Sequence, residues 1–597
     1  MGCTSSSSAE RDPTMHEIGD FRQEMVWERQ GRLFEEVYEI LDHLGAGSMG
    51  AVSLVRKRPD ANRSVARSGS KNDLLADLRL PHYYAAKLLD YDGPESQRRK
   101  SKVSAARLQE LRHEIDVLRR VDHPNIVHLR EAFWEAKRLV LVMELCEGTM
   151  LSALAGRVGE ACVASCAEQL LRAVAYLHSH EIVHRDLKLD NIMALGEAAR
   201  AVAGAPSGGA KYDEELSVTL IDFGLSRLRR ITLKDEPAQK VAAAGTLSTA
   251  APEVVRGGEY SPAADVWSCG ASLYRLIAVE DPFLHDHVDA DAAAIQKLEA
   301  AAIPWLPAAV FAAATKEGKK FLYNCMRAKL TSRWSSAEAT KFALRTWLPA
   351  ARLSRDGEAE VSGGSAASWS PESPTTSLAR LRVAAPMLRR QSSEPFTPRS
   401  PAAQTLELST SMRKYASYSD LKRAALIVAA HQTDHRHAES LRLAFNALDT
   451  TATGGVRVGD LRDALRDHVR DSEIELLFEK LDHDRSGVVH YHEFLAATME
   501  SRPDLLDDEV LRDAFDRLDS DDTGCISEDN LTKILGKSAS TANVRQMIAD
   551  GDFKKNGSID FDEFTMLMRQ PSAPPPTRRE EPAEDARPRG ASFGITF

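Results

Sequence analysis

One stretch of the chain decides the fold: Val183-His184-Arg185-Asp186-Leu187-Lys188-Leu189-Asp190-Asn191. Its pattern, H-R-D-x-K-x-x-N, presents an acid, a lysine and an amide at fixed spacing. Phosphoryl transfer from a nucleotide to a hydroxyl needs these groups, because the acid accepts the hydroxyl proton, the lysine offsets phosphoryl charge and the amide holds magnesium. We assign these catalytic roles to Asp186, Lys188 and Asn191. A nonamer alone could also be a solvated surface loop, so the rest of the chain has to decide.

Length and composition describe a soluble protein of several domains. A chain of 597 residues is too long for one hydrophobic core. Its hydrophobic content of 43% and charged content of 28% are ordinary, and no apolar run approaches the length of a membrane-spanning helix. The net charge of -11 gives no reason to expect a nucleic-acid partner. The 7 cysteines lack paired spacing, which fits a reducing compartment, so we expect a cytoplasmic protein.

The N-terminal residues carry a possible lipid anchor. Met-Gly-Cys-Thr-Ser-Ser fits the N-myristoylation pattern, with Gly2 as the acceptor and Ser6 at the required hydroxyl position. One myristoyl chain binds membranes only marginally, so palmitoylation of the neighbouring Cys3 is what would make anchoring stable. We expect membrane association through both acyl groups. The alternative is an ordinary Ser-rich terminus, because the motif is short.

A glycine-rich segment comes before a strand-like segment that carries a lysine. The glycine-rich residues are Leu44-Gly45-Ala46-Gly47-Ser48-Met49-Gly50-Ala51-Val52. Three glycines at this spacing let a hairpin lie close over nucleotide phosphates, because a side chain would block the backbone's approach. The pattern is weak alone, but Lys87 follows it in Ala-Ala-Lys, where a lysine would hold the α- and β-phosphates. We assign the whole segment and Lys87 to nucleotide binding.

Two triplets follow the catalytic stretch in order. Asp222-Phe223-Gly224 comes after an apolar strand, and its carboxylate would bind the magnesium that bridges nucleotide phosphates. Ala251-Pro252-Glu253 lies further along the chain. A D-F-G triplet is common by chance, but chance does not explain this order of motifs. We therefore expect Asn191 and Asp222 to bind magnesium.

These motifs resemble those of the eukaryotic protein kinases, and Lys188 resembles the serine/threonine branch. The resemblance implies an ion pair between Lys87 and Glu114, which lies on a helix predicted at 103–121. Most glutamates on helices are simply solvated, and that is the alternative for Glu114. The downstream His-Pro-Asn-Ile-Val at 123–127 is also similar to the family and favours the pair.

The same resemblance implies roles for residues outside the catalytic motifs. Glu144 and Cys146 belong to the hinge segment that would hold the nucleotide. Arg333 is expected to pair with Glu253, which is a structural role. Two insertions depart from the family pattern and are interpreted as surface excursions that add nothing to the core: 58–81 and 198–210.

Four repeated loops follow, each flanked by helical patterns. They start at Asp449, Asp482, Asp519 and Asp552, 33 residues apart within each half. Calcium-binding helix-loop-helix sites have twelve-residue loops with oxygen ligands at positions 1, 3, 5, 7, 9 and 12 and a glycine at 6. The second loop has a suitable residue at every ligand position. Its predicted metal ligands are Asp482, Asp484, Ser486, the carbonyl of Val488, His490 through water, and Glu493 with two oxygens.

The other three loops are impaired. The first has only Asp449 and the short Asp460 as carboxylates, so a helix pair without metal is a fair alternative there. Asn530 removes the bidentate carboxylate of the third loop, and Lys554 puts a positive charge at a ligand position of the fourth. The remaining ligands of the third loop would be Asp519, Asp521, Thr523 and Ser527. Those of the fourth would be Asp552, Asn556, Ser558, Asp560 and Glu563.

A basic, apolar segment precedes the loops. Residues 412–430 have helical spacing, which predicts a calmodulin-type target helix or, alternatively, a helix packed on its neighbour. The Ser/Pro-rich stretch before it cannot bury enough apolar surface to fold alone. The predicted units are a leader at 1–37, a kinase domain at 38–348, a disordered linker at 349–410, a junction helix at 411–435, loop pairs at 436–500 and 506–569, and a disordered tail at 570–597.

The order of these units resembles the calcium-dependent protein kinases of plants, algae and protists over residues 38–569. The resemblance implies an α+β, bilobal protein kinase fold followed by an all-α, calmodulin-like domain of four EF-hands. It also implies a calcium-regulated serine/threonine kinase that uses ATP, Mg2+ and Ca2+ and acts on protein substrates.

In that family the junction helix blocks the substrate cleft at low calcium and is drawn off when the calcium lobes close on it. The rival hypothesis is a catalytically inactive scaffold whose calcium lobes recruit partners. Every expected catalytic position is intact in the sequence, which favours the kinase. Magnesium-dependent ATP turnover would separate the two.

Overall fold

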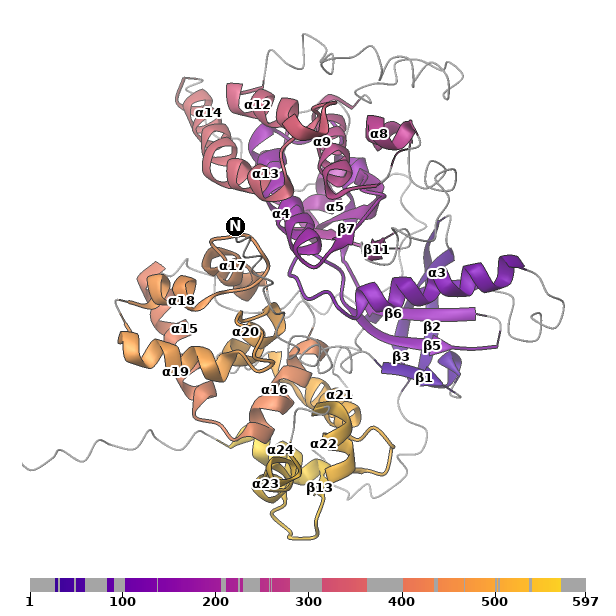
Figure 1. Cartoon of the computed structure of the whole chain (residues 1–597), viewed down its shortest axis with the longest axis vertical. Helices are drawn as coiled ribbons and strands as arrows, with labels where there is room; N and C mark the ends of the chain where they lie inside the picture. The colour runs from indigo at the N-terminus through magenta and orange to yellow at the C-terminus, as the bar shows by residue number, and fades with distance from the viewer. Residues whose placement is uncertain are drawn as a thin grey trace, which may run out of the picture.

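The structure is a computed structural model, and Figure 1 shows a sheet-containing lobe, a helical lobe and a second helical unit beside them. Outside the described residues lie Gly2, Cys3, Ser48, Met49 and nearly all of the expected insertion at 58–81. The described residues are 27–30, 33–47, 50–58, 83–90, 102–136, 138–205, 211–223, 226–228, 247–256, 258, 260–279, 314–361, 401–433, 439–466, 468–499, 502, 505–535 and 540–570.

The first lobe is built on a six-stranded sheet with the strand order β1-β5-β6-β4-β3-β2. All neighbours are antiparallel except β1 and β5. Helix α3 (Lys102–Leu118) packs on the sheet through the buried Leu111 and Ile115, which confirms the helix predicted at 103–121. The strands are β1 (Trp27–Gln30), β2 (Tyr38–Gly47), β3 (Gly50–Lys57), β4 (Tyr83–Asp90), β5 (Leu129–Trp134) and β6 (Arg138–Glu144).

The end of the expected leader belongs to this lobe. Helix α2 (Phe34–Val37) buries both of its terminal apolar side chains in the same core as Phe133. The Phe34 ring meets the Phe133 ring edge to face, with centroids 5.6 Å apart. The leader predicted at 1–37 was therefore wrong at its C-terminal end. Helix α2 is too short to show a helical periodicity in the sequence, so the pattern did not reveal it.

The second lobe is helical and surrounds two buried helices, α4 (Glu160–Ser179) and α9 (Pro262–Ala278). Both helices carry small or apolar residues on nearly every face, so they can be enclosed by other elements. Around them lie α8 (Pro252–Val255), α12 (Lys316–Cys325) and α13 (Ser336–Phe342). Two small sheets join the lobes: β7 (Gly148–Met150) with β9 (Ile192–Leu195) and β10 (Val218–Leu220), and β8 (Ile182–Val183) with β11 (Arg227–Leu228).

Two segments predicted to lie outside the core are helices packed on this lobe. Helix α5 (Gly196–Gly204) buries Ala199 and Val202 against the β7–β9 sheet, so the insertion at 198–210 is not a pure surface excursion. Helix α14 (Leu348–Val361) buries Leu348 and Ala351, and it packs on α4. The small alanine side chains of both helices allow this close packing. Their alanine-rich composition resembles that of a linker, and for that reason the sequence did not indicate packed helices.

Within the described residues, the second helical unit contains four helix-loop-helix motifs in two pairs. Figure 1 draws this unit in orange and yellow. In the first pair, Val456 and Val489 exchange backbone hydrogen bonds of 2.9 and 2.8 Å. In the second pair, β12 (Cys525–Ile526) lies antiparallel to β13 (Ile559–Asp560). The helices are α17 (Glu439–Leu448), α18 (Val458–Leu465), α19 (Asp471–Leu481), α20 (Tyr491–Thr498), α21 (Asp508–Leu518), α22 (Glu528–Leu535), α23 (Thr541–Gly551) and α24 (Phe561–Arg569).

The junction is two helices rather than the single helix expected at 411–435. Helix α15 (Pro401–Ala416) begins inside the predicted linker, and α16 (Asp420–Gln432) follows after a short turn. The hydroxyl of Ser419 accepts the backbone N–H of Lys422, so it caps α16 and marks the break. The linker predicted at 349–410 was therefore wrong at both ends, where α14 and α15 lie. None of the helices in the described ranges is both long and apolar enough to cross a membrane.

Candidate active site and calcium loops

The lysine predicted to bind the nucleotide, Lys87, is held by two carboxylates. Lys87 pairs directly with Val52 across β3 and β4, so the glycine-rich hairpin and the lysine share one sheet. Its Nζ lies 2.7 Å from Oε1 of Glu114 and 2.8 Å from Oδ1 of Asp222. Burial tends to lower the pKa of Lys87 because it disfavours the charged ammonium. The attraction of the two carboxylates outweighs this effect, so the pKa of Lys87 is raised. The predicted ion pair with Glu114 is confirmed.

The three side chains predicted to be catalytic lie together. Nζ of Lys188 donates to Oδ2 of Asp186 over 2.8 Å. The amide nitrogen of Asn191 donates to the same oxygen over 3.0 Å and to the backbone carbonyl of Asp186 over 2.8 Å. The Asp186 carboxylate is thus fixed by two donors beside the region where a hydroxyl would be placed. This arrangement suits a proton acceptor.

A buried aspartate on α9 fixes the backbone of this loop. The carboxylate of Asp265 accepts the backbone N–H of His184 at 2.8 Å and that of Arg185 at 2.9 Å. It also lies 2.9 Å from Nε2 of His178. Burial opposes ionisation, but these donors hold the pKa of Asp265 below its usual value. The catalytic motifs alone did not predict this positioning role. Its signal in the sequence is an acidic residue in the middle of a largely apolar stretch.

The loop backbone is strained at one position. Arg185 has a φ of 73°, in the left-handed region that side chains other than glycine rarely adopt. Tyr260 donates its hydroxyl to the Arg185 carbonyl over 2.9 Å and so supports this conformation. The next residue is Asp186, whose carboxylate meets Lys188 and Asn191.

The glycine-rich hairpin approaches the neighbouring strand closely. A Cβ at Gly50 would lie 2.2 Å from the carbonyl oxygen of Leu88, so only glycine fits there. Gly45 meets no such obstacle. The remaining described residues of the predicted segment lie in the two strands, Leu44 at a register shift in β2 and the others in the β2–β3 ladder: Ala46, Gly47, Ala51 and Val52.

The hinge residues are placed differently from one another. The Glu144 side chain is buried and accepts the backbone N–H of His128 over 2.8 Å, so contact with a nucleotide would fall to the Glu144 backbone. Cys146 is half-buried and packs on the core of the helical lobe. Far from the hinge, Arg333 forms two hydrogen bonds with Glu253, 2.6 and 2.9 Å long. The structural pair predicted between Arg333 and Glu253 is confirmed.

The second calcium loop gathers oxygen ligands as predicted. One oxygen of each of Asp482, Asp484 and Glu493 lies within 4.8 Å of the other two. Burial and the charge of Asp484 raise the pKa of Asp482 to about 6. The hydroxyl of Ser486 donates to the Val488 carbonyl over 2.9 Å. It also lies 3.1 Å from Nε2 of His490, so all predicted ligands border one space. Crowded oxygens of this kind fit Ca2+.

In the third and fourth loops, a side chain of the loop itself bonds to one of the acids predicted to bind calcium. The amide nitrogen of Asn530 donates to Oδ1 of Asp521 over 3.0 Å in the third loop. The ammonium of Lys554 forms an ion pair with Asp560 in the fourth. Each group supplies positive charge or donors where calcium would bind. The loops keep their turns, with Asp519 and Asp552 accepting backbone N–H groups of the residues that follow: Thr523, Gly524, Asn556 and Gly557.

The first loop contacts the kinase helix α4. Nη1 of Arg172 donates to the Asp449 carbonyl over 2.8 Å, across a separation of 277 residues. A Cβ at Gly454 would lie 2.3 Å from the ring of Tyr176, so the loop backbone approaches that helix closely. Asp460, the short ligand, accepts the backbone N–H of Arg457 over 3.0 Å. The first loop therefore works as a contact surface, a role that sequence analysis missed.

Comparisons with known proteins agree with this geometry. A family model described as a protein kinase domain matches residues 82–344, and one described as an EF-hand domain pair matches residues 438–499 and 508–569. The kinase match starts after the first insertion, although β2 and β3 continue the same sheet ahead of it. The kinase fold thus extends to the N-terminal side of the matched residues.

Two relatives cover most of the chain. Calcium-dependent protein kinase 5 of Plasmodium falciparum is 25% identical over 77% of this chain and 70% of its own length. Calcium-dependent protein kinase 17 of Arabidopsis thaliana is 25% identical over 92% of this chain and 88% of its own length. The solved autoinhibited serine kinase domain of the giant muscle protein titin matches at 22% identity, over 53% of this chain and 83% of that chain, with a TM-score of 0.39.

The fold and the site define a protein kinase joined to EF-hand domains. Within that class, the chain belongs to the family of calcium-dependent protein kinases. It is a calcium-regulated serine/threonine protein kinase that uses ATP, Mg2+ and Ca2+. The catalytically inactive scaffold is not supported.

Proposed function

We propose that calcium at the second loop controls where the junction helices lie, and thereby whether protein substrates reach Asp186. The supporting observation is the burial of α16. Its residues 421–431 are all buried, and the helix packs on α20 and α21 as well as on α23 and α24. A helix enclosed by both EF-hand pairs cannot also occupy the substrate cleft. This arrangement corresponds to the released state of the kinase.

A short mechanical path joins the second loop to α16. Glu493 supplies the last ligand of the loop and lies in the first turn of α20. Helix α20 packs directly on both α15 and α16. An ion that draws Glu493 toward Asp482 and Asp484 therefore shifts the helix against which the junction rests. Calcium would favour the arrangement in which its ligands converge, which is a population shift.

We assign the phosphoryl-transfer roles to the residues around Asp186. Asp186 would accept the substrate hydroxyl proton while Lys188 stabilises charge on the transferred group. Asn191 donates to Asp186 through its amide nitrogen, so its carbonyl oxygen is the atom that would bind Mg2+. Asp222 would supply a second oxygen, and its side chain is 33% exposed. Bound Mg2+ and ATP supply the phosphoryl group and neutralise charge on its phosphates.

Phosphorylation of a serine peptide by the purified full-length chain, with and without calcium, tests the activity. We expect transfer that needs Mg2+ and ATP and rises with calcium. Asp186→Asn should lower the rate at least about a hundredfold while nucleotide binding persists. Asp190→Asn, the same change at an exposed acid of the same loop, is the matched control. Transfer by Asp186→Asn at the wild-type rate would contradict the assignment.

Truncation tests the inhibitory role of the junction. A chain that ends after Val361 retains the kinase lobes and α14 but lacks both junction helices and the calcium loops. We expect this shorter chain to phosphorylate the peptide at the same rate with and without calcium. A truncated chain that binds ATP normally but stays inactive would refute inhibition by the junction.

We further propose that the protein is held on membranes, facing the cytoplasm, by acylation of Gly2 and Cys3. The support is the N-terminal sequence, together with the two-chain requirement for stable anchoring. Gly2→Ala should move the protein into the soluble fraction. Cys3→Ser should weaken retention without preventing myristate incorporation. Equal membrane fractions for wild type and Gly2→Ala would refute the proposal.

A further inference from the structure

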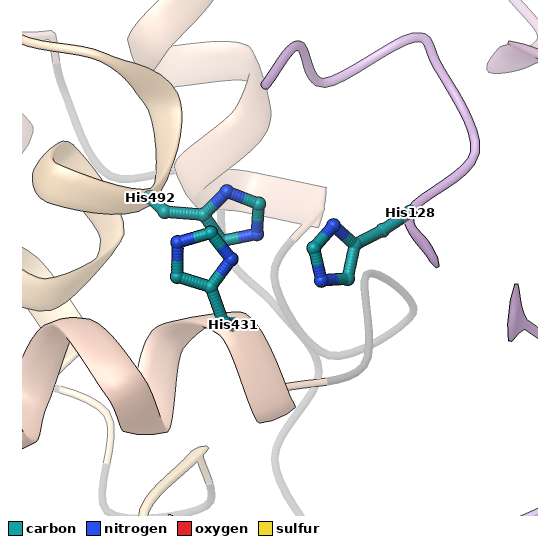
Figure 2. A group of neighbouring side chains, drawn as sticks. All are labelled: His128, His431 and His492. Atoms are coloured by element: carbon teal, nitrogen blue, oxygen red, sulfur yellow. The ribbon is translucent and has the colours of Figure 1, made fainter. Parts of the chain in front are cut away.

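Three histidines from distant parts of the chain meet where the kinase domain, the junction and the first EF-hand pair come together. His128 directly precedes β5 in the kinase domain, His431 lies in the last turn of α16, and His492 lies in the first turn of α20. One ring nitrogen of each lies within 4.8 Å of the other two. Figure 2 shows the three imidazole rings side by side, with His128 approaching from a loop and the other two from helices. His431 and His492 are buried and His128 is half-buried.

Asp122 orients one of these rings. Its carboxylate lies 2.6 Å from Nδ1 of His492 and accepts the backbone N–H of the same residue over 3.2 Å. Asp122 is itself 4% exposed. A carboxylate on Nδ1 leaves Nε2 as the ligand atom of His492. Metal-binding histidines usually have this kind of outer carboxylate, because it fixes the ring and makes the other nitrogen a better donor.

Packing of the rings alone is the plainer explanation of the cluster. The rings of His431 and His492 stack with centroids 3.8 Å apart and an interplanar angle of 12°. Stacking does not account for His128, whose ring lies 4.8 Å from that of His492 at an angle of 50°. Nor does it account for a buried carboxylate aimed at the far nitrogen of His492. Three nitrogen donors with an outer carboxylate are instead the elements of a zinc site.

We propose that His128, His431 and His492 form a Zn2+ site that ties the kinase domain to the junction and to the first EF-hand pair. Imidazole nitrogen suits Zn2+, whereas Ca2+ and Mg2+ prefer oxygen ligands. Zinc-to-nitrogen bonds of about 2.0–2.1 Å place tetrahedral ligand atoms roughly 3.3 Å apart. The nitrogens lie within 4.8 Å of one another, so a small inward movement suffices, and His128, the most exposed of the three, lies on a loop that allows it. Because the rings of His431 and His492 are nearly parallel and Asp122 fixes His492, the His431 ring must turn to aim its in-plane lone pair at the ion.

Such an ion would act on the calcium switch. It can have all three ligands only when α16 is enclosed by the EF-hand pairs and those pairs lie against the kinase domain. Binding to one arrangement stabilises that arrangement. His492 precedes Glu493, the last calcium ligand of the second loop. Zinc and calcium would therefore favour the same state and strengthen each other's binding.

Zinc binding by the full-length protein, measured by calorimetry with saturating calcium, tests the site without using kinase activity. We expect one Zn2+ per chain. His431→Gln should weaken its affinity at least about a hundredfold, and Asp122→Asn should weaken it about 10- to 100-fold. His468→Gln, at a histidine outside the cluster, is the matched control and should bind as the wild type does. Retention of the released fold is checked by the thermal unfolding midpoint.

The outcomes separate clearly. His128→Gln provides a second test at the half-buried loop position, should His431→Gln fail to fold. No zinc uptake by the wild type, or undiminished uptake by both histidine variants, would overturn the proposal, since any ion bound would then lie elsewhere. The coupling predicts that zinc lowers the calcium concentration for half-saturation several-fold in the wild type and not in His431→Gln. An unchanged calcium affinity in zinc-loaded wild type would overturn the coupling.

Discussion

The second and fourth calcium loops have similar backbone conformations but differ in the side chains at their ligand positions. Arg485 and Gly487 in the second loop have φ values of 55° and 83°, and Lys555 and Gly557 in the fourth have 56° and 85°. In the second loop the acidic side chains converge on one another, whereas in the fourth the ammonium of Lys554 meets an acid. Turn residues therefore determine the shape of these loops, and a single side chain determines whether a cation is needed.

The first and third loops extend this comparison. In the third loop, the side-chain amide of Asn530 donates a hydrogen bond to the carboxylate of Asp521. In the first, Asp449 contacts Arg172 of the kinase domain, and Asp460 accepts two donors from its own loop. The third and fourth loops thus place a side-chain amide or ammonium on a ligand carboxylate, and the first turns toward the kinase domain, whereas the acids of the second loop converge on one another. The calcium response should rest chiefly on the second loop.

The largest effect is expected from Glu493→Gln. The change removes one of three converging carboxylates, and glutamine cannot supply two charged oxygens to Ca2+. Half-maximal peptide phosphorylation should then need at least about tenfold more calcium. Glu479→Gln, at an exposed position of α19, is the control and should leave the response unchanged. An unaltered calcium response in Glu493→Gln would remove the second loop from the switch.

A gain is expected in the fourth loop. Lys554→Asp replaces the ammonium by a carboxylate at a ligand position and releases Asp560 from its ion pair. Calcium affinity of this loop should rise about tenfold, because repulsion of the cation is replaced by attraction. Lys555→Asn, which keeps a residue that tolerates the left-handed backbone, is the control. Calorimetry that shows no added ion in Lys554→Asp would break the comparison between the two loops.

A smaller gain is expected in the third loop. Asn530→Glu restores the missing bidentate ligand but also removes the hydrogen bond from Asn530 to Asp521. Affinity should improve about threefold, since a further carboxylate strengthens the ligand set while the loop loses an internal bond. Thr532→Glu adds the same charge on an exposed face of α22 and should have no effect on calorimetric binding. Equal gains in both variants would mean that charge alone, and not ligation, is responsible.

The smallest effect is expected from Asp460→Asn. The amide oxygen of asparagine can still accept the N–H of Arg457, and its nitrogen can donate to the Thr450 hydroxyl, so the loop keeps its shape. The calcium concentration for half-maximal activity should change by less than about twofold. A large loss would mean that the first loop holds calcium in addition to contacting Arg172.

Much of the active site could be predicted from the sequence. The pairs Lys87–Glu114 and Arg333–Glu253 follow from motifs whose residue types and order define one geometry. The turns of the calcium loops were also predictable. Each loop keeps the glycine at its sixth position, even where a lysine or an amide replaces a ligand. Local chemistry was sufficient for these features.

Contacts between distant segments were not predictable. The bond from Arg172 to Asp449 joins residues 277 positions apart, and His492 contacts Asp122 across 370 positions. Periodicity describes one helix at a time and does not say which helix it meets. The alanine-rich α5 shows the same limit, because its composition suggested exposure although its neighbours bury Ala199 and Val202.

The most direct test is to count the calcium ions bound per chain, by native mass spectrometry, at the calcium concentration that half-activates the kinase. We predict no more than one ion per chain, carried by about half of the chains, in the wild type and in Glu479→Gln, and none in Glu493→Gln. Two or more ions in the wild type at that concentration, or one ion retained by Glu493→Gln, would contradict the claim that the second loop is the switch.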